Sequence, residues 1–521
     1  MLLFAFGIGV AAVVAALAVY VVGTWLLYAR TQPKYSGTSL LKSNIPKDLS
    51  ERALNAQEAS FHRFTTSCGI LNMVYSLEFV GVPFDETELH AAIHHVLRRF
   101  PVLRSRILQR GEQLWLVDSA AGAAAGGGGA AAVVPPIEIE YVQPDGTASL
   151  DAELERSVQR VLQRHFRTPF AIAQPVWRVS LVRPSASASP SSSFHLVLCY
   201  DHTVMDGTAA MSVFTELERY LRALRRHDGD AVAALDAAPA HPFLPPLSEL
   251  VPPCGLAYWT KHVLTCLGYS FVLPLILRFV PLPLPAYPLL PRPTPDDPDA
   301  RRTRWIYREL SVEDSRRLLL QCRKESTTIT AAIVAAAIEA VHEQQASKTY
   351  EWSSNFSVRP HLVPPIDHEL VGCFFGGSRV NTAYNPKFWE LARACKKDLT
   401  DAIEPLALLR PITIDVSNLL NALRPRISYF PHGRVSLMNI SNLGAFELPH
   451  NTSAPAAATG NFQLVRLMRG TEESLMGPLF CHNVVSINGK LSITLSYTEP
   501  SVSRETAEHH VDRIITLLQT S

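Results

Sequence analysis

The sequence has no excess of charge of either sign, because 48 lysines and arginines face 47 aspartates and glutamates in 521 residues. A nucleic-acid-binding protein carries a basic excess or a clustered basic face, so that class of protein is excluded. No C-x-x-C pair occurs among the eight cysteines, and no thiolate or carboxylate set accompanies the histidine pairs at 94–95 and 509–510. We therefore expect no disulfide framework and no metal, and we expect both histidine pairs to face solvent.

Charge is also absent from the first 29 residues, which are mostly Leu, Val, Ala, Ile and Phe. A helix that spans a bilayer needs about 20 apolar residues. A cleaved signal peptide, the alternative, begins with basic residues that this segment lacks. We expect residues 1–29 to form a transmembrane anchor.

The flanks of this segment predict its orientation. Arg30 and Lys34 follow it, and the positive-inside rule then keeps the body of the protein in the cytosol. We expect a single-pass protein of the endoplasmic reticulum or a related endomembrane. Glycosylation sequons begin at Asn355, Asn439 and Asn451 and favour a luminal body instead, but the first two lie in segments predicted to be buried strands.

Beyond the anchor, hydrophobic periodicity predicts two mixed α/β subdomains, at 45–230 and 301–521, joined by a crossover at 231–300. Within the crossover, 263–277 is apolar but contains Pro274 and is too short to span a membrane comfortably. This stretch is either a buried helix or part of a membrane-interfacial segment at 263–290.

The local patterns are clearest around one turn. The apolar run Phe194–Tyr200 predicts a buried strand, and helical periodicity begins beyond Gly207. The other elements that we predict are a helix capped by Asp85 and Glu88, a helix at 331–341, a strand at 435–440 ending in a turn at 441–444, a hairpin at 484–497 around Asn488-Gly489, and a C-terminal helix.

The turn itself, residues 202–207, reads HTVMDG. The spacing His-x-x-x-Asp-Gly is expected only about 0.03 times by chance in this composition. A neutral imidazole accepts a proton near pH 7, and Gly207 leaves space for a substrate. The pattern favours His202 as a general base, although it is also typical of a buried structural histidine followed by a helix cap at Asp206.

With these residues the chain resembles the superfamily of chloramphenicol acetyltransferase, condensation domains and fungal alcohol O-acetyltransferases, most closely the CoA-using, alcohol acetyltransferase-like branch. The resemblance covers residues 50–520. Besides His202, Asp206 and Gly207, it rests on RRFPVL at 98–103, PVWRV at 175–179, SVRP at 357–360, GCF at 372–374 and SNLG at 441–444.

The resemblance implies a pseudo-dimer of two chloramphenicol-acetyltransferase-like subdomains with a tunnel at their interface. His202 would lie midway, with acyl-CoA, acetyl-CoA above all, entering one mouth and the acceptor the other. Asp206 would pair with Arg359 in a structural role. The oxyanion needs a donor, for which Ser441 and Asn442 are candidates. No bound cofactor, metal or obligate protein partner is implied.

The expected function is therefore CoA-dependent O-acyl transfer to a hydrophobic alcohol by a membrane-associated enzyme. Asp201 stands where condensation domains usually carry a second histidine, which favours the CoA-using branch. Two alternatives remain: transfer from a carrier-protein thioester, and a non-catalytic, membrane-bound lipid-binding protein. The sequence leaves open the acceptor, the acyl length and the oligomeric state.

Overall fold

The computed structural model of the chain describes residues 15, 17–23, 25–26, 49–120, 134–143, 149–185, 193–250, 255–267, 300–403, 433–448 and 462–521. Within these ranges no helix is both long and apolar enough to cross a membrane. Most of the predicted anchor at 1–29, most of the crossover stretch at 263–290 and the sequon at Asn451 lie outside the described residues.

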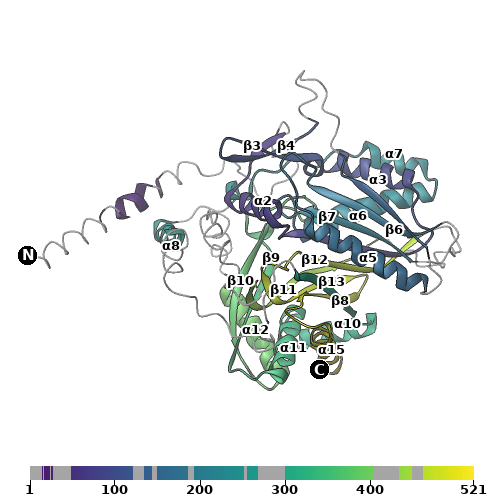
Figure 1. The fold of residues 1–521 in the computed structure, drawn as a ribbon. Coiled ribbons are helices and arrows are strands. Elements are labelled where there is room, and N and C mark those ends of the chain that lie inside the picture. The colour runs from purple at the N-terminus through teal and green to yellow at the C-terminus, as the bar shows by residue number, and fades with distance from the viewer. Residues whose placement is uncertain are drawn as a thin grey trace, which may run out of the picture.

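The first half of the described chain, residues 49–250, is built on a mixed five-stranded sheet of order β12-β2-β7-β6-β5 (Figure 1). A small antiparallel sheet of order β1-β4-β3 lies beside it. The strands of these two sheets are β1 (Glu51–Ala53), β2 (Asn72–Gly81), β3 (Ser105–Arg110), β4 (Gln113–Asp118), β5 (Ile137–Val142), β6 (Trp177–Pro184), β7 (Ser193–Asp201) and β12 (Phe462–Thr471).

Helices cover both faces of the five-stranded sheet. Helices α3 and α6 pack together on one face, and α5 crosses the other face and reaches β8 of the second half. The N-cap of α3 is Asp85, whose side chain accepts from the Glu88 backbone while Glu88 reaches back, so the predicted capping box is confirmed. The helices of this half are α2 (Ala56–Cys68), α3 (Glu86–Arg99), α5 (Leu150–Arg167), α6 (Gly207–Arg225) and α7 (Gly229–Ala237).

The second half, residues 300–521, has a six-stranded sheet of order β10-β9-β11-β13-β14-β8. Its strands are β8 (Arg302–Glu309), β9 (Thr349–Ser357), β10 (Phe375–Ala383), β11 (Arg434–Phe446), β13 (Gly477–Ile487) and β14 (Lys490–Glu499). Its helices are α10 (Val312–Lys324), α11 (Ile329–Gln344), α12 (Phe388–Ala402) and α15 (Arg504–Thr520). The small-residue helix α11 is almost entirely buried, because Ala side chains let α12 and α15 approach it closely.

Strand β12 ties the two halves together. It belongs to the second half in sequence, yet it pairs with β2 at the edge of the first-half sheet, with Leu467 opposite Leu77. The predicted division at 231–300 does not include this exchange. One edge of the first sheet is therefore completed by a strand that begins at Phe462, far beyond β2, which ends at Gly81. The two halves depend on each other.

The turn predicted at 441–444 is wrong. Residues 441–444 do not end a strand: β11 continues through them to Phe446, with a register shift between Asn442 and Ala445 and positive φ at Gly444. The glycine therefore forms a bulge and not a chain reversal. The predicted hairpin around Asn488-Gly489 is confirmed, and both residues have the positive φ of a type I′ turn.

The histidine pairs do not both face solvent. His94 and His509 are exposed as predicted, but His95 and His510 are buried. His95 lies 3.0 Å from Glu216, and His510 stacks on Phe480. Adjacent residues on a helix point in different directions, so one member of each pair faces the core. The described residues contain no group of three or more side chains arranged to hold a metal ion.

Candidate active site

His202 lies in the turn between β7 and α6. Its strand is buried along almost its whole length, which fixes where the turn begins. The turn is held by a backbone hydrogen bond from Val204 to Asp201 (3.1 Å) and by one from Asp206 to Gly372 of the second half (3.2 Å). The position of His202 is therefore set by both halves of the molecule.

The imidazole of His202 has a defined tautomer. Its Nδ1 lies 3.0 Å from the carbonyl oxygen of Met205, and a carbonyl can only accept, so Nδ1 carries the proton and Nε2 keeps its lone pair. The ring stacks on Phe375 with 4.7 Å between centroids. Burial lowers the pKa of His202, against the opposing charge of Asp206. The imidazole is thus neutral at pH 7, with Nε2 able to accept a proton.

The carboxylate of Asp206 organises the turn and does not contact the imidazole by any hydrogen bond found among the described residues. One oxygen accepts from the Ala209 backbone at 2.9 Å, which caps α6. The other accepts from Arg359 Nη1 at 2.6 Å and from the Phe374 backbone at 2.8 Å. The ion pair that the family resemblance implied is present, and it joins the two halves.

Arg359 is buried at the start of the short 3-10 helix η5 (Arg359–His361), after β9. Its Nη2 donates to the carbonyls of Leu370 and Gly372, both at 3.3 Å, and its guanidinium lies over the Phe374 ring. A planar guanidinium can serve a carboxylate and several carbonyls at once, which a lysine cannot do. Arg359 therefore orders residues 370–374 against the turn that carries His202.

Gly207 is required by a close approach of β11. A Cβ built at this position would lie 2.4 Å from Cδ2 of Leu443 and 3.3 Å from the Tyr75 hydroxyl. Leu443 belongs to the second half, within the SNLG segment. Two of the segments on which the resemblance rests are thus in contact, and a side chain at 207 would force the Leu443 side chain to shift.

Cys373 is the one thiol beside the imidazole in the described chain. Its Sγ lies 4.0 Å from His202 Nδ1, the nitrogen whose proton is donated to Met205. Burial raises the pKa of Cys373 well above its usual value. A protonated thiol is a poor nucleophile, so this pair does not have the electrostatics of a catalytic cysteine and histidine.

A cavity of about 430 Å³ opens beside His202, between the halves. The first half contributes mainly apolar side chains, including Phe61, Phe64, Ile70, Leu71 and Met73. The second half contributes mainly polar ones, including Ser353, Asn355, Asn439, Ser441, Asn442, Arg469, Glu472, Glu473 and Asn483. The volume suits a small-molecule substrate, and its walls differ in polarity.

Ser441 and Asn442 both line this cavity, but their side chains are engaged differently. The amide nitrogen of Asn442 donates to Thr330 at 3.0 Å, and its oxygen accepts from the Gly444 backbone. The Ser441 hydroxyl accepts from Arg469 at 3.1 Å and keeps its own proton to donate. The Asn442 amide nitrogen likewise keeps a second N–H, so both side chains retain a donor for an oxyanion.

The residue before the histidine has a partner that the sequence did not indicate. Asp201 is fully buried and lies 2.6 Å from Nδ1 of His62 on α2, and it also accepts from the Thr203 backbone at 2.9 Å. Burial alone would raise the pKa of Asp201, but the contact with His62 holds it below its usual value. The pair joins α2 to the turn across 139 residues, a separation at which no local pattern relates the two.

Two further residues of the cavity wall were missed. Arg469 on β12 donates to the Ser441 backbone and hydroxyl and to the Val484 carbonyl, so it links the exchanged strand to β11 and β13. Glu473, just beyond β12, is buried and lines the same cavity. The run Arg469-Gly-Thr-Glu-Glu473 carries no spacing typical of a site, so only the fold could reveal it.

Comparison with solved structures places the fold. A trichothecene 15-O-acetyltransferase from Fusarium sporotrichioides is 12% identical with a TM-score of 0.62, covering 92% of this chain and 99% of that one. The epimerization domain from the third module of tyrocidine synthetase B is 14% identical with a TM-score of 0.57, covering 91% and 97%. The starter condensation domain of rhizomide synthetase, solved in complex with C8-CoA and Leu-SNAC, is 13% identical with a TM-score of 0.56, covering 90% and 94%.

These likenesses confirm the mixed α/β, chloramphenicol-acetyltransferase-like fold that condensation domains share. No curated protein matches the sequence significantly. The family model for alcohol acetyltransferase matches residues 148–521, which is more than half of the chain and includes His202, Asp206, Gly207 and Arg359. The chain belongs to the alcohol acetyltransferase family.

Proposed function

We propose that the protein is a CoA-dependent O-acyltransferase in which His202 is the general base for direct transfer to an alcohol. The observation that carries the proposal is the tautomer of His202, whose Nδ1 is committed to Met205 and whose ring lines a substrate-sized cavity. Membership of the alcohol acetyltransferase family supports acyl transfer as the reaction. A buried histidine with a purely structural role would leave Nε2 without a function at this cavity.

The reaction balances without a covalent enzyme intermediate. His202 Nε2 takes the proton of the acceptor hydroxyl as that oxygen forms a bond to the thioester carbonyl carbon. The carbonyl oxygen becomes negative, and the Ser441 hydroxyl is the candidate donor to it. The carbon–sulfur bond then breaks, and the CoA thiolate takes the proton back from Nε2. The products are an ester and free CoA.

Acyl-CoA is the donor that we propose, with acetyl-CoA first among those to test. A structural neighbour was solved with C8-CoA, which shows that this fold can take such a thioester in that protein. In this chain Arg379 on β10 lines the cavity and is solvent-exposed, and so offers a cation to the phosphates of CoA. The acceptor that we propose is a largely hydrophobic alcohol, in keeping with the apolar wall.

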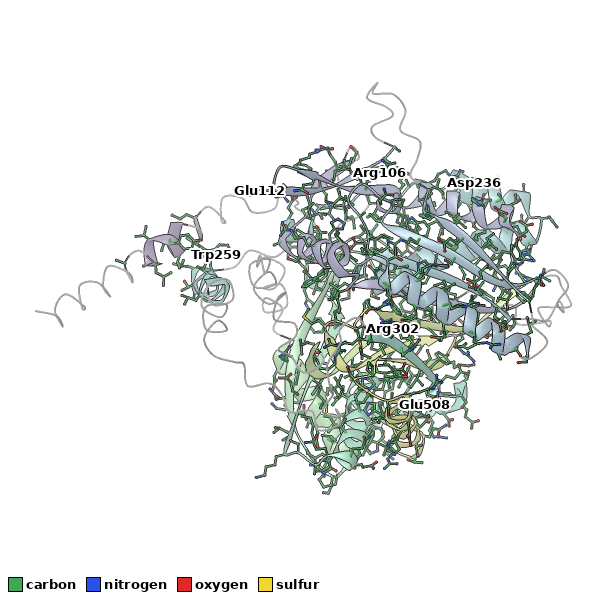
Figure 2. All side chains as sticks on the ribbon, in the orientation of Figure 1. Arg106, Glu112, Asp236, Trp259, Arg302 and Glu508 are labelled. Carbon is green, nitrogen blue, oxygen red and sulfur yellow. The ribbon has the colours of Figure 1, made fainter. Side chains whose placement is uncertain are left out.

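The predicted membrane association belongs to the same proposal. We propose that residues 1–29 anchor the protein in the endoplasmic reticulum or a related endomembrane, with the catalytic body in the cytosol. Helix α8 (Leu256–Leu267) carries Leu256 and Leu264 exposed, and Figure 2 shows its Trp259 beside the main body and not within it. Such a helix has the apolar surface of an interfacial segment.

The test compares the full-length wild type with His202→Ala and with His368→Ala, a control at an exposed histidine. Free-thiol release from acetyl-CoA and longer acyl-CoAs is followed over a panel of alcohols, and the ester is identified by mass spectrometry. We expect His202→Ala to lose about 10²–10⁴-fold in rate and the control to retain full activity. Equal rates in all three proteins would remove His202 from the mechanism.

The same three proteins, given a carrier-bound acyl group as an alternative donor and tested for alcohol binding, separate the rival functions. A carrier-protein-dependent enzyme would leave acyl-CoA untouched and would accept an acyl group from a phosphopantetheinylated carrier domain. A lipid-binding protein without activity would bind alcohols equally well with and without His202 and would turn over neither donor.

A further inference from the structure

Glu473 holds a buried carboxyl at the wall of the cavity that also contains His202. The residue follows β12 and is 6% exposed. Its backbone is fixed on both sides, because its N–H donates to Thr303 at 3.0 Å and its carbonyl accepts from Arg434. A Cβ at position 477 would lie 2.9 Å from the Glu473 Cβ, so Gly477 provides the space that this side chain occupies.

One oxygen of this carboxyl is satisfied and the other is not. Oε1 accepts from the Thr471 hydroxyl at 2.8 Å. Oε2 is buried and makes no hydrogen bond of standard geometry among the described residues, although the Cys481 thiol lies near enough to lower the pKa of the carboxyl. The nearby Cys481 thiol donates to Asn439 at 3.6 Å, and a thiol is a weak donor in any case. A buried, unsatisfied carboxyl oxygen costs stability, so its presence in a cavity wall points to a ligand.

The chemistry of this part of the cavity identifies the kind of ligand. Glu472 lines the cavity beside Glu473, so two acidic groups lie together there. In their ionised form these groups repel a polyanion such as the phosphate end of CoA, which is attracted to Arg379 instead. A neutral hydroxyl, in contrast, can donate to Oε2. Burial raises the pKa of Glu473 to about 7, against the opposing effects of Thr471 and Arg434, so the group also retains a neutral form that tolerates an uncharged partner.

We infer that Glu473 binds a second hydroxyl of the acceptor, remote from the hydroxyl that is esterified, so that the preferred acceptor is a diol or polyol on an apolar skeleton. The inference rests on the proposed function, because it places the acceptor in this cavity. It gives the polar wall a role that a simple hydrophobic alcohol would not use. It also makes Glu473 a specificity-determining residue and not a catalytic one.

The test pairs α,ω-alkanediols of about four to twelve carbons with alkan-1-ols of the same length, on the full-length protein with acetyl-CoA. The variants are Glu473→Leu, which removes the acceptor oxygens, and Glu473→Gln, which keeps the shape and one carbonyl oxygen. Binding of the same alcohols to His202→Ala, with and without Glu473→Leu, is measured by calorimetry, where no turnover interferes.

We expect the wild type to prefer the diol over its matched mono-alcohol by about 10- to 100-fold in kcat/KM at one optimal length. Glu473→Leu should abolish that preference, and Glu473→Gln should keep part of it. The length at which the preference is largest reports the distance from His202 to Glu473.

The outcomes distinguish the two proposals. A diol preference that is absent, or unchanged in Glu473→Leu, overturns the inference even if the enzyme acylates alcohols. A rise in the KM for acetyl-CoA alone assigns Glu473 to the pantetheine arm and equally overturns it. A Glu473-dependent diol preference in the calorimetry, with no turnover by the wild type, would uphold the subsite while refuting the proposed function. No binding of either alcohol would count against both.

Discussion

Replacing Asp206 with asparagine tests whether the ion pair between the halves holds the catalytic turn. Asp206 and Arg359 are 3% and 2% exposed, and the bond between them is 2.6 Å long. Asparagine preserves the shape and is as good a helix cap as aspartate, so the bond from Ala209 can remain and the main change is the loss of charge. Arg359 then stays buried facing a neutral amide. Removing one partner of a buried pair costs about 3–5 kcal/mol.

The same substitution should reduce activity without changing the chemistry of the base. Gly372 and Phe374 contact Asp206 through their backbones, so a shift of this contact moves the second-half wall against His202. A misplacement of about 1 Å can cost about 10²-fold in rate. We expect kcat/KM to fall by that order, and the pH midpoint that His202 imposes to move lower, because the charge of Asp206 no longer raises the pKa of the imidazole.

The assay is a double-mutant cycle of Asp206→Asn, Arg359→Met and their combination, read as urea unfolding midpoints and as kcat/KM. The combined variant leaves no buried charge, so its loss should be smaller than the sum of the single losses by about 2 kcal/mol or more. Asp228→Asn is the matched control, because Asp228 caps α7 at an exposed site. The reasoning is refuted if Asp206→Asn is no more harmful than this control, or if the single losses simply add.

Three further predictions concern the same site. Gly207→Ala should destabilise the protein by about 1–3 kcal/mol through its clash with Leu443. Adding Leu443→Ala to the same chain should restore much of the loss in the urea unfolding midpoint. A Gly207→Ala variant that is more stable than the wild type would contradict the close approach. Because burial lowers the pKa of His202, kcat/KM should hold at pH 6.5 and decline only at lower pH, as its base becomes protonated; a decline already complete at pH 6.5 would show that the imidazole is solvated. Folding raises the pKa of Glu473 from 4.5 to about 7, so the folded state binds the proton more tightly than the unfolded state. The free energy of unfolding should therefore fall by up to about 3 kcal/mol as pH rises from 4.5 to 7. Glu473→Gln should flatten this part of the profile of urea midpoint against pH, and an unchanged slope would contradict the shift.

Sequence patterns predicted what depends on neighbours along the chain. The run Phe194–Tyr200 is buried within β7, the capping box at Asp85 begins α3, and Asn488-Gly489 makes the expected hairpin. Each of these follows from periodicity or from backbone preferences over a few residues. The prediction failed where the same backbone preferences fit two structures. Gly444 is compatible with a turn or with a bulge, and it forms a bulge within β11.

The cavity walls could not be predicted in this way, because their contacts join distant segments. His62 meets Asp201 across 139 residues, and Arg469 meets Ser441 only because β12 crosses to the other sheet. The pairing of Asp206 with Arg359 was expected only from the family resemblance, since nothing in the spacing of 153 residues indicates it. Tertiary packing of this kind leaves no local period in the sequence.

The geometry explains why the sequence specifies His, Asp and Gly in this turn. Each of the three is held by the second half: the ring of His202 by Phe375, the carboxylate of Asp206 by Arg359, and Gly207 by the close approach of Leu443. A turn that needed only to cap α6 would require the aspartate alone, because any residue could stand at 202 and many at 207. The three residues together therefore mark an interface, and the histidine is placed where that interface opens into the cavity. Since β12 also completes the first-half sheet from the second half, neither half can present this site by itself, and the chemistry that we propose belongs to the assembled chain.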